Sequence, residues 1–323
     1  MYQPEPLDAE STAVAEHAMR VSDLFVDLTR GLPSGTIVRR DEPMARRTTL
    51  RVGGPVDLYV EPQSESDLSL VLEYCKGQSM PWFVLGRGSN LLVRDGGVRG
   101  LAISLAQQAF SQVAVQNQQL ICGAGARLKT ISQTAKREGL SGLEFLEGIP
   151  GTLGGAMRMN AGAMGAWTFH VLDHLRFMDP SGMIHESAGR QVGSEYRSCP
   201  LFHTHIALGA VLSGKASAPD QIRETLELYN RKRWESQPPQ PSAGCTFKNP
   251  SPDLPAGRLI DELGLKKYRS GNAMVSDVHA NFIVNLGGAT ASDVLRVIDE
   301  VQTRARHQRG IDLHVEVEIL GEN

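Results

Sequence analysis

The sequence lacks the cysteine and histidine spacing of a metal site. Its four cysteines form no CxxC pair, and its nine histidines are scattered along the chain, so the ligand spacings of a zinc site do not occur. The cysteines are Cys75, Cys122, Cys199 and Cys245. Isolated cysteines of this kind are typical of a reduced protein, and we expect a cytoplasmic location and no resident metal.

Two further absences argue against a membrane protein and a nucleic-acid-binding protein. No apolar run is long enough to span a bilayer, and Met1 to Glu16 is acidic without an apolar segment, unlike a secretory signal. Lys and Arg total 33 against 36 Asp and Glu, a net charge of −3, whereas proteins that neutralise phosphate backbones are normally basic. We therefore expect neither a membrane nor nucleic acid among the partners.

The composition is otherwise that of an ordinary globular protein, with one excess. Of the 323 residues, 41% are hydrophobic and 21% are charged, which excludes a disordered chain. The length is enough for two or three cores of ordinary size. Glycine is in excess, with 33 residues in the chain against a usual frequency of ~7%, and these glycines cluster.

Strand and helix patterns cover most of the chain. Val56 to Val60 alternates like a half-buried strand, and Ser64 with Asp67 is typical of a capped helix start. Thr290 with Asp293 marks a second capped start. Further strands are expected at 82–85, 99–105, 112–122, 171–178, 206–213 and 313–320, and further helices at 14–32, 127–138, 221–234 and 258–263.

These patterns predict an α+β protein with two domains. Strands and helices mix without a regular βαβ rhythm, and no internal repeat occurs. The composition shifts over 214–220, which indicates a domain boundary. We expect an N-terminal extension over 1–37, a nucleotide-binding domain over 38–214 and a smaller C-terminal domain over 215–323.

Two glycine clusters that follow expected strands form the candidate cofactor site. Successive small residues let backbone N–H groups converge on an anion, and interleaved hydroxyls add donors, so a phosphate or pyrophosphate fits. Tight turns and close packing are the alternative explanation. The candidate residues are Gly86, Arg87, Gly88, Ser89, Asn90, Gly148, Gly151, Thr152, Gly154, Gly155, Asn160, Ala161 and Gly162.

The spacing of the glycines excludes the commonest nucleotide motifs. No GxxxxGK[ST] is present, so there is no P-loop. Gly123 to Leu128 breaks the GxGxxG pattern at its last position and lacks the βαβ setting. A dinucleotide held by another fold remains open.

Six segments resemble one known family, the UDP-N-acetylenolpyruvoylglucosamine reductases. The resemblance covers roughly 38–323, in family order, and its motifs are jointly very specific. The segments are Thr48-Thr-Leu-Arg-Val-Gly-Gly-Pro55, Leu85-Gly-Arg-Gly-Ser-Asn-Leu91, 148–165, Tyr196-Arg197, Ala243-Gly-Cys-Thr-Phe-Lys-Asn-Pro250 and Glu316-Val-Glu-Ile-Leu-Gly321.

The resemblance implies a flavoenzyme of cytoplasmic peptidoglycan precursor synthesis. Members reduce UDP-N-acetylglucosamine enolpyruvate to UDP-N-acetylmuramate, with non-covalent FAD and with NADPH as hydride donor. The implied fold is an FAD-binding domain of the vanillyl-alcohol-oxidase type, with two subdomains over 38–214, followed by a C-terminal substrate-binding domain. The short stretch after Tyr196-Arg197 resembles the compact form of the family, which lacks an extra substrate-covering loop.

The resemblance also implies three catalytic residues. Hydride from the reduced flavin adds to the terminal carbon of the enolpyruvyl group, and the charge that develops in the substrate carboxylate needs a fixed cation and a donor. Arg197 supplies the cation, because its planar fork suits a carboxylate. Glu316 matches the catalytic glutamate. Glu318 lies two residues on and shares its strand face, so only the motif selects Glu316.

Cys245 is the sharpest departure from the family pattern. The best-known members carry serine at this position as the proton donor to carbon. A thiol, with a reference pKa of ~8.5, is a more acidic donor than an alcohol. The interpretation is that Cys245 is the donor, and the alternative is a small buried cysteine that packs like alanine.

Four residues are candidate substrate contacts by the same resemblance. Arg233 and Lys248 match basic positions near the diphosphate, and Asn249 matches a contact to the nucleotide-sugar. Tyr196 packs by the sugar or fills core. The family also implies that NADPH and the UDP-sugar use one pocket in turn, and that a compact member is a monomer.

Two other functions remain as alternatives. The first is a flavin oxidase of the same fold, with flavin linked covalently through His170 or Cys199. The motif over 243–250 would not be expected in such an enzyme. The second is a non-catalytic UDP-sugar sensor, against which the intact Arg197, Cys245 and Glu316 argue.

Overall fold

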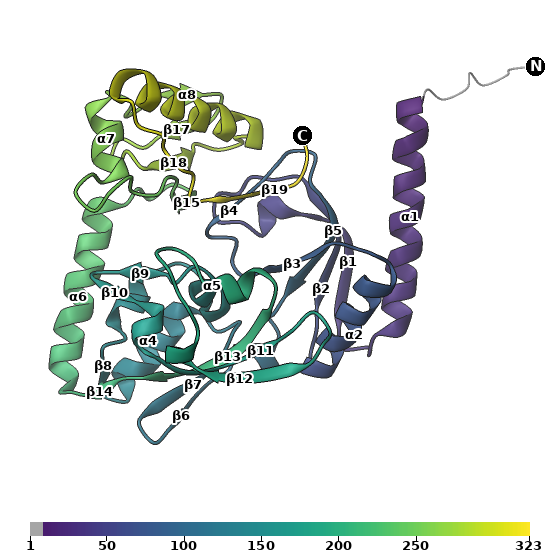
Figure 1. Ribbon diagram of the computed structural model, residues 1–323, viewed down its shortest axis with the longest axis horizontal. Helices are drawn as coiled ribbons and strands as arrows, with labels where there is room; N and C mark the ends of the chain where they lie inside the picture. Colours follow the sequence, from purple (N-terminus) through teal and green to yellow (C-terminus); the bar gives the residue numbers. More distant parts are fainter. Residues whose placement is uncertain (1–8) are drawn as a thin grey trace, which may run out of the picture.

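The computed structural model describes residues 9–323, so the first eight residues of the expected extension lie outside the described part. The described part begins with helix α1 (Ala9–Gly31), where the sequence predicts a helix over 14–32. In Figure 1 this helix lies at one edge of the molecule, beside β1 and α2. Val21 and Leu28 on α1 are buried in the main core.

The first layer is a four-stranded sheet in the order β1-β2-β5-β3. Its strands are β1 (Ile37–Pro43), β2 (Pro55–Glu61), β5 (Val98–Ser104) and β3 (Trp82–Leu85). Helix α2 (Glu65–Gly77) begins where the Ser64 hydroxyl accepts the Asp67 N–H, which satisfies one free donor of the first turn. Its apolar face, with Leu68 and Leu72, packs into the core with β2 and β5.

The second layer is a five-stranded antiparallel sheet in the order β12-β11-β13-β7-β6. The strands are β12 (Ile184–Ala188), β11 (Leu172–Met178), β13 (Ile206–Ser213), β7 (Gln119–Gly123) and β6 (Val113–Gln116). Helix α4 (Leu128–Arg137) packs near β6 and β7. The short elements are η1 (Met44–Arg46), α3 (Gln108–Ser111), β8 (Leu140–Ser141), η2 (Glu144–Gly148), α5 (Leu153–Arg158), β9 (Gly162–Ala163), β10 (Ala166–Trp167), η3 (Thr168–His170), η4 (Gly189–Gln191), η5 (Pro200–His203) and β14 (Lys215–Ala216).

The C-terminal part is a four-stranded sheet covered by helices. The sheet order is β15 (Ser242–Cys245), β18 (Phe282–Asn285), β17 (Ala273–Val275) and β16 (Arg269–Ser270). Helix α6 (Pro219–Ser236) leads into it, α8 (Ala291–Arg309) packs on β17 and β16, and α7 (Ala256–Glu262) packs against α8. The expected capping box at Thr290 and Asp293 is present. The α+β class is confirmed.

Two expected strands are wrong in extent. The segment 112–122 is a hairpin, β6 and β7, because Asn117 and Gln118 turn the chain with φ of 50° and 62°. The final strand is only β19 (Glu318–Leu320), where 313–320 was expected. The alternating residues before it belong to another unit: Leu313 and Val317 fill the C-terminal core.

The last strand joins the two parts of the molecule. Strand β19 leaves the C-terminal part and pairs in parallel with β4 (Leu91–Val93) of the first part. Figure 1 shows this crossing at the centre of the molecule. Leu50, Val52 and Leu92 add to the C-terminal core from the first part. These contacts fix both parts around the region where the glycine clusters lie.

Candidate active site

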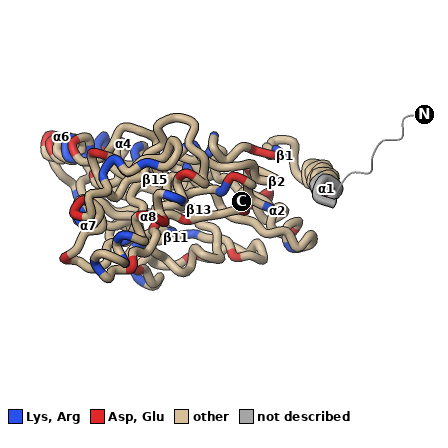
Figure 2. Tube along the Cα trace, turned by 90° about the horizontal axis from the view of Figure 1, so that it is seen from above, with Lys and Arg blue, Asp and Glu red and all other residues tan. Residues whose placement is uncertain are grey.

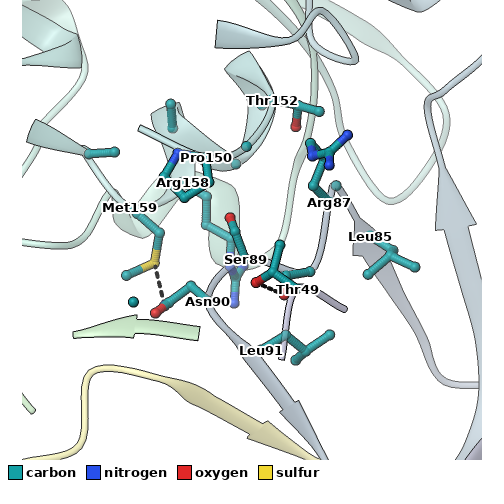
Figure 3. Close-up of a pocket in the computed structure, with 18 of the residues that line it drawn as sticks. Thr49, Leu85, Arg87, Ser89, Asn90, Leu91, Pro150, Thr152, Arg158 and Met159 are labelled. Carbon is teal, nitrogen blue, oxygen red and sulfur yellow. Dashed lines mark hydrogen bonds between the residues drawn. The ribbon is translucent and has the colours of Figure 1, made fainter. Parts of the chain in front are cut away.

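A cavity of about 1670 Å³ lies between the two parts of the molecule. Pockets for single small molecules are typically about 300–1,000 Å³, so this one has room for an extended cofactor and a second ligand. Figure 3 shows side chains that line it, from the loop after β3 and from the loop that leads into α5. Residues 237–245 line it from the C-terminal side.

Both glycine clusters line the cavity. Of the thirteen candidate cofactor residues, all except Asn160 are among the lining residues. In Figure 3, Arg87 and Ser89 of the first cluster lie across from Pro150 and Thr152 of the second.

Glycine is needed for different reasons at different positions of the two clusters. At Gly88, φ is +58° and a Cβ would lie 2.5 Å from the Arg47 carbonyl oxygen, so close packing of the protein itself requires glycine there. At Gly148 a Cβ would meet no protein atom within 4 Å. Close packing of the protein therefore does not explain the glycine at this position. A cofactor that lies against the backbone at Gly148 would explain it. The clusters fit FAD with its pyrophosphate.

Positive charge dominates the cavity wall. Among the described lining residues are eight arginines and only two glutamates, Glu316 and Glu318. Five of the arginines make no ion pair with a described residue: Arg46, Arg51, Arg87, Arg127 and Arg233. Elsewhere both signs are interspersed along the chain, as Figure 2 shows. The local excess suits ligands with several negative charges.

The structure brings the three candidate catalytic residues together. Arg197 Nε lies 2.9 Å from Glu316 Oε1, with 22% and 11% of the two side chains exposed. The N–H does not point at that oxygen, so Arg197 Nε is buried without an aligned acceptor. The charges of both residues act on the pKa of the Cys245 thiol: Glu316 raises it and Arg197 lowers it. A buried donor without an acceptor at a cavity wall is what a carboxylate ligand would use.

Burial is the largest influence on the protonation of Glu316 and Cys245. It raises the pKa of Glu316 above its ordinary value, although the positive charges of Arg197 and Lys248 lower it in part. Burial likewise raises the pKa of the Cys245 thiol to about 11, and the Glu316 carboxylate adds to that rise. The thiol is therefore protonated at neutral pH.

Arg197 adopts an unusual backbone conformation. Its φ is +57°, in the left-handed region that residues with a side chain rarely adopt. Its Nη1 also donates to the carbonyl oxygen of Gly162 at 3.4 Å, in the second glycine cluster. A strained residue at a cavity wall is common where a side chain must point at a ligand.

The sequence interpretation missed Asn281. Its Oδ1 accepts the Phe247 N–H at 2.9 Å, and its Nδ2 donates to the Phe247 carbonyl oxygen at 2.8 Å. Its own carbonyl accepts the Thr246 N–H at 2.8 Å, and a hydrogen bond from its side chain opposes the pKa rise of Cys245. Asn281 thus fixes the Cys245 segment. A single asparagine 36 residues from Cys245 in sequence gives no local signal of that role.

Asn160 does not line the cavity. Its Nδ2 donates to the Glu195 carbonyl oxygen at 3.2 Å and its Oδ1 accepts the Phe169 N–H at 3.3 Å. Asn160 is 8% exposed, and it supports the second glycine cluster from behind.

Of the four candidate substrate contacts, only Arg233 lines the cavity. Asn249 Oδ1 accepts the N–H of Ala256, the first residue of α7, at 3.0 Å. The Tyr196 ring lies against the guanidinium of Arg197, 5.4 Å from its carbon to the ring centroid. Lys248 is near enough to lower the pKa of Glu316. These three residues surround the site without facing the cavity.

The two residues considered for covalent flavin attachment lie away from the cavity. Neither His170 nor Cys199 is among the described lining residues. Cys199 is fully buried, and its thiol faces the Gly193 carbonyl oxygen at 3.6 Å. The His170 ring packs edge-on against Trp167. Neither position suits a flavin linkage.

Comparison with known proteins identifies the family. The family model for the UDP-N-acetylenolpyruvoylglucosamine reductase C-terminal domain matches residues 237–320. The family model for an FAD binding domain matches residues 56–188. The reductase of Moorella thermoacetica is 40% identical over 305 residues, which is 94% of this chain and 99% of its relative. The chain belongs to the UDP-N-acetylenolpyruvoylglucosamine reductase family.

Other members of this reductase family give the same result. The reductase of Heliobacterium modesticaldum is 41% identical over 88% of this chain and 91% of its own length. The crystal structure of the reductase from Thermus caldophilus aligns with a TM-score of 0.76 at 36% identity, covering 88% of this chain and 99% of that one. The expected FAD-binding domain and C-terminal domain are confirmed, and so is the flavin-dependent oxidoreductase class.

Residues 9–323 lack two other features. No group of three or more His, Cys, Asp or Glu side chains in this part of the chain is placed to hold a metal ion. None of its helices combines the length and apolarity that crossing a bilayer requires.

Proposed function

We propose that this chain reduces UDP-N-acetylglucosamine enolpyruvate to UDP-N-acetylmuramate with Arg197, Glu316 and Cys245 as its catalytic residues. The family membership carries the reaction and the cofactors, FAD and NADPH. The observation that supports the residue roles is the meeting of these three side chains at a cavity that both glycine clusters line. Bound FAD supplies the hydride that NADPH delivers to it.

Arg197 and Glu316 act on the substrate carboxylate. Hydride addition to the terminal carbon moves negative charge into that carboxylate. Arg197 has a buried Nε–H without an aligned acceptor, so it can bind the growing charge without first breaking a hydrogen bond. Glu316 has a raised pKa. In its protonated form Glu316 donates a hydrogen bond to the same carboxylate.

Cys245 delivers the proton that completes the reduction. Its pKa of about 11 keeps the thiol protonated before turnover. Proton transfer to the carbon leaves a thiolate, and the positive charge of Arg197 lowers the cost of that thiolate. Solvent then returns the proton, since Cys245 is only partly buried at the cavity wall.

NADPH and the UDP-linked substrate use the cavity in turn. The remaining arginines suit either ligand, because both carry a diphosphate. Arg233 lies on the C-terminal side of the cavity, where it can reach a diphosphate. We further propose a cytoplasmic monomer that binds neither membrane nor nucleic acid, because the two parts of one chain complete the cavity and the net charge is −3.

An anaerobic two-step flavin titration tests this function. The purified protein is reduced with NADPH, and the UDP-linked enolpyruvyl sugar is then added. We expect stoichiometric flavin reoxidation with formation of UDP-N-acetylmuramate. Reduction without reoxidation by the sugar, but with fast recovery in air, would indicate an oxidase. A protein that binds the UDP-sugar and carries no flavin would indicate a sensor.

A further inference from the structure

Two glutamates reach the arginine-lined cavity from the end of the chain, and each has its own arginine. Arg197 Nε lies 2.9 Å from Glu316 Oε1. Arg158 Nη2 donates to Glu318 Oε1 at 2.7 Å. Both glutamates line the cavity, although only Glu318 belongs to β19. The proposed reaction uses Glu316 and Arg197 and leaves the second pair without a role.

Arg158 is held from two sides. It is the last residue of α5, which follows the second glycine cluster. Its Nη1 donates to the Phe202 carbonyl oxygen at 2.5 Å, and its Nη2 is bound to Glu318. The side chains of Arg158 and Glu318 are 33% and 40% exposed. A guanidinium fixed in this way neutralises Glu318 at one defined place.

The backbone beside the two glutamates is held by a different residue. Asn90 Nδ2 donates to the Glu316 carbonyl oxygen at 3.1 Å, and the Asn90 carbonyl accepts the Glu318 N–H at 3.0 Å. The register of β19 on β4 places Glu318 opposite Leu91. Because the strand is fixed without Arg158, the contribution of Arg158 is the charge that it sets against Glu318.

We propose that Arg158 neutralises Glu318 and thereby leaves Arg197 to Glu316 and to the substrate carboxylate. This inference rests on the proposed function. Without Arg158, the Glu318 carboxylate would be a free acid on the same wall as Glu316. It would compete for Arg197 and would repel the carboxylate and diphosphate of the substrate. Arg158 is a positioning residue that does not touch the reacting atoms.

A rescue experiment separates this role from a purely structural one. Arg158→Met leaves Glu318 unpaired, and we expect kcat/KM for the UDP-linked substrate to fall about tenfold, mostly through KM. Adding Glu318→Gln removes the free charge, and we expect the double variant to regain most of that loss. A structural role for Arg158 predicts no rescue, because the contact to Phe202 stays broken in both variants.

The control is an ion pair of the same type on the surface. Arg306 Nε lies 2.6 Å from Asp312 Oδ1, and both side chains are about two-thirds exposed, at 67% and 65%. We expect Arg306→Met to leave kcat/KM unchanged. A double variant Arg158→Met with Glu318→Gln that is as slow as Arg158→Met alone would overturn the proposal.

If Arg158→Met loses its flavin, a second variant still tests the proposal. Arg158→Lys keeps the positive charge, and we expect kcat/KM within about threefold of wild type at low salt, with a larger loss as salt screens the pair. An equal loss at every salt concentration contradicts the proposal. The wild-type protein must first complete the two-step flavin titration, so failure of the proposed function is seen separately from failure of the rescue.

Discussion

At the scale of single residues, the thiol of Cys245 can be tested directly as a proton donor. A general acid typically contributes about 10²–10⁴-fold to a rate. We expect Cys245→Ala to lower kcat by at least ~100-fold, while NADPH still reduces the flavin. Cys245→Ser keeps an O–H donor and should stay within about tenfold of wild type. Stopped-flow absorbance of the flavin in each half-reaction measures both effects.

The control for the cysteine series is Cys199→Ala. Cys199 is fully buried and lies away from the cavity, so its removal should change stability and leave the oxidative half-reaction as it is. If Cys245→Ala reoxidised its flavin with substrate at the wild-type rate, Cys245 would be only a packing residue.

Glu316 predicts a pH dependence of stability. Burial raises its pKa in the folded state above the ordinary value of 4.5, so ionising Glu316 costs folding free energy. Its protonated form is fully compatible with the fold at low pH, and the cost appears as pH rises from about 4.5 through the raised folded value. Glu316→Gln stays neutral, and we expect its Tm relative to wild type to rise over that window. A constant Tm difference from pH 4 to about pH 8 would contradict the raised pKa.

The sequence located the proposed catalytic residues better than the residues that support them. Arg197, Cys245 and Glu316 lie in motifs of several residues, so resemblance places them, and the structure brings them to one wall. Asn281 and Arg158 act through partners 34 and 160 residues away in the chain. Such pairings depend on tertiary contacts, and no local pattern in the sequence reveals them.

At the scale of elements, Asp95 links α8 to the first part of the molecule. Its carboxylate accepts the N–H groups of Ala291 and Ser292 at 2.7 and 2.9 Å, in the first turn of that helix. Burial alone would raise the pKa of Asp95, but the hydrogen bonds from Ser292 and Ala291 outweigh it and lower the pKa. We expect Asp95→Asn to reduce the free energy of unfolding by ~1 kcal/mol at pH 7, measured by urea denaturation.

The pH dependence of this effect has a definite sign. A carboxylate with a depressed folded pKa stabilises the fold above its unfolded pKa of ~3.9, and that stabilisation is lost as pH falls through the folded value. The difference between wild type and Asp95→Asn should therefore shrink below about pH 4. Asp299→Asn, at an exposed position on the same helix, should show no difference at either pH.

Helices were easier to predict than strand ends. The starts of α2 and α8 follow from capping patterns of two residues spaced three apart, and both caps form. The alternation over 313–320 predicted one strand, yet Leu313 and Val317 alternate because they fill the C-terminal core before the chain reaches β4. Alternating apolar residues indicate that one face of a segment is buried. They do not indicate which sheet or core buries that face.

At the scale of the whole molecule, the boundary near 214 remains a prediction. Helix α6 starts after it, and α6 packs against α4 and η2 of the first part. Ile222 and Leu226 are the buried residues of that helix. The matched C-terminal family domain starts only at residue 237. A change in composition marks a connecting segment and does not tell which part the next helix packs on.

The charge of the whole molecule and that of its cavity differ in sign, and this difference can be measured. The chain carries a net charge of −3, while eight arginines face two paired glutamates in the cavity. Salt screens charges over a Debye length of ~10 Å at 0.1 M, so we expect KM for NADPH to rise several-fold between about 50 and 500 mM salt, with less change in kcat. Arg233→Met removes one lining arginine without an ion pair and should reduce the slope of that rise. A KM that is independent of salt in both proteins would mean that the arginines bind the cofactor and leave no free charge for the incoming ligand.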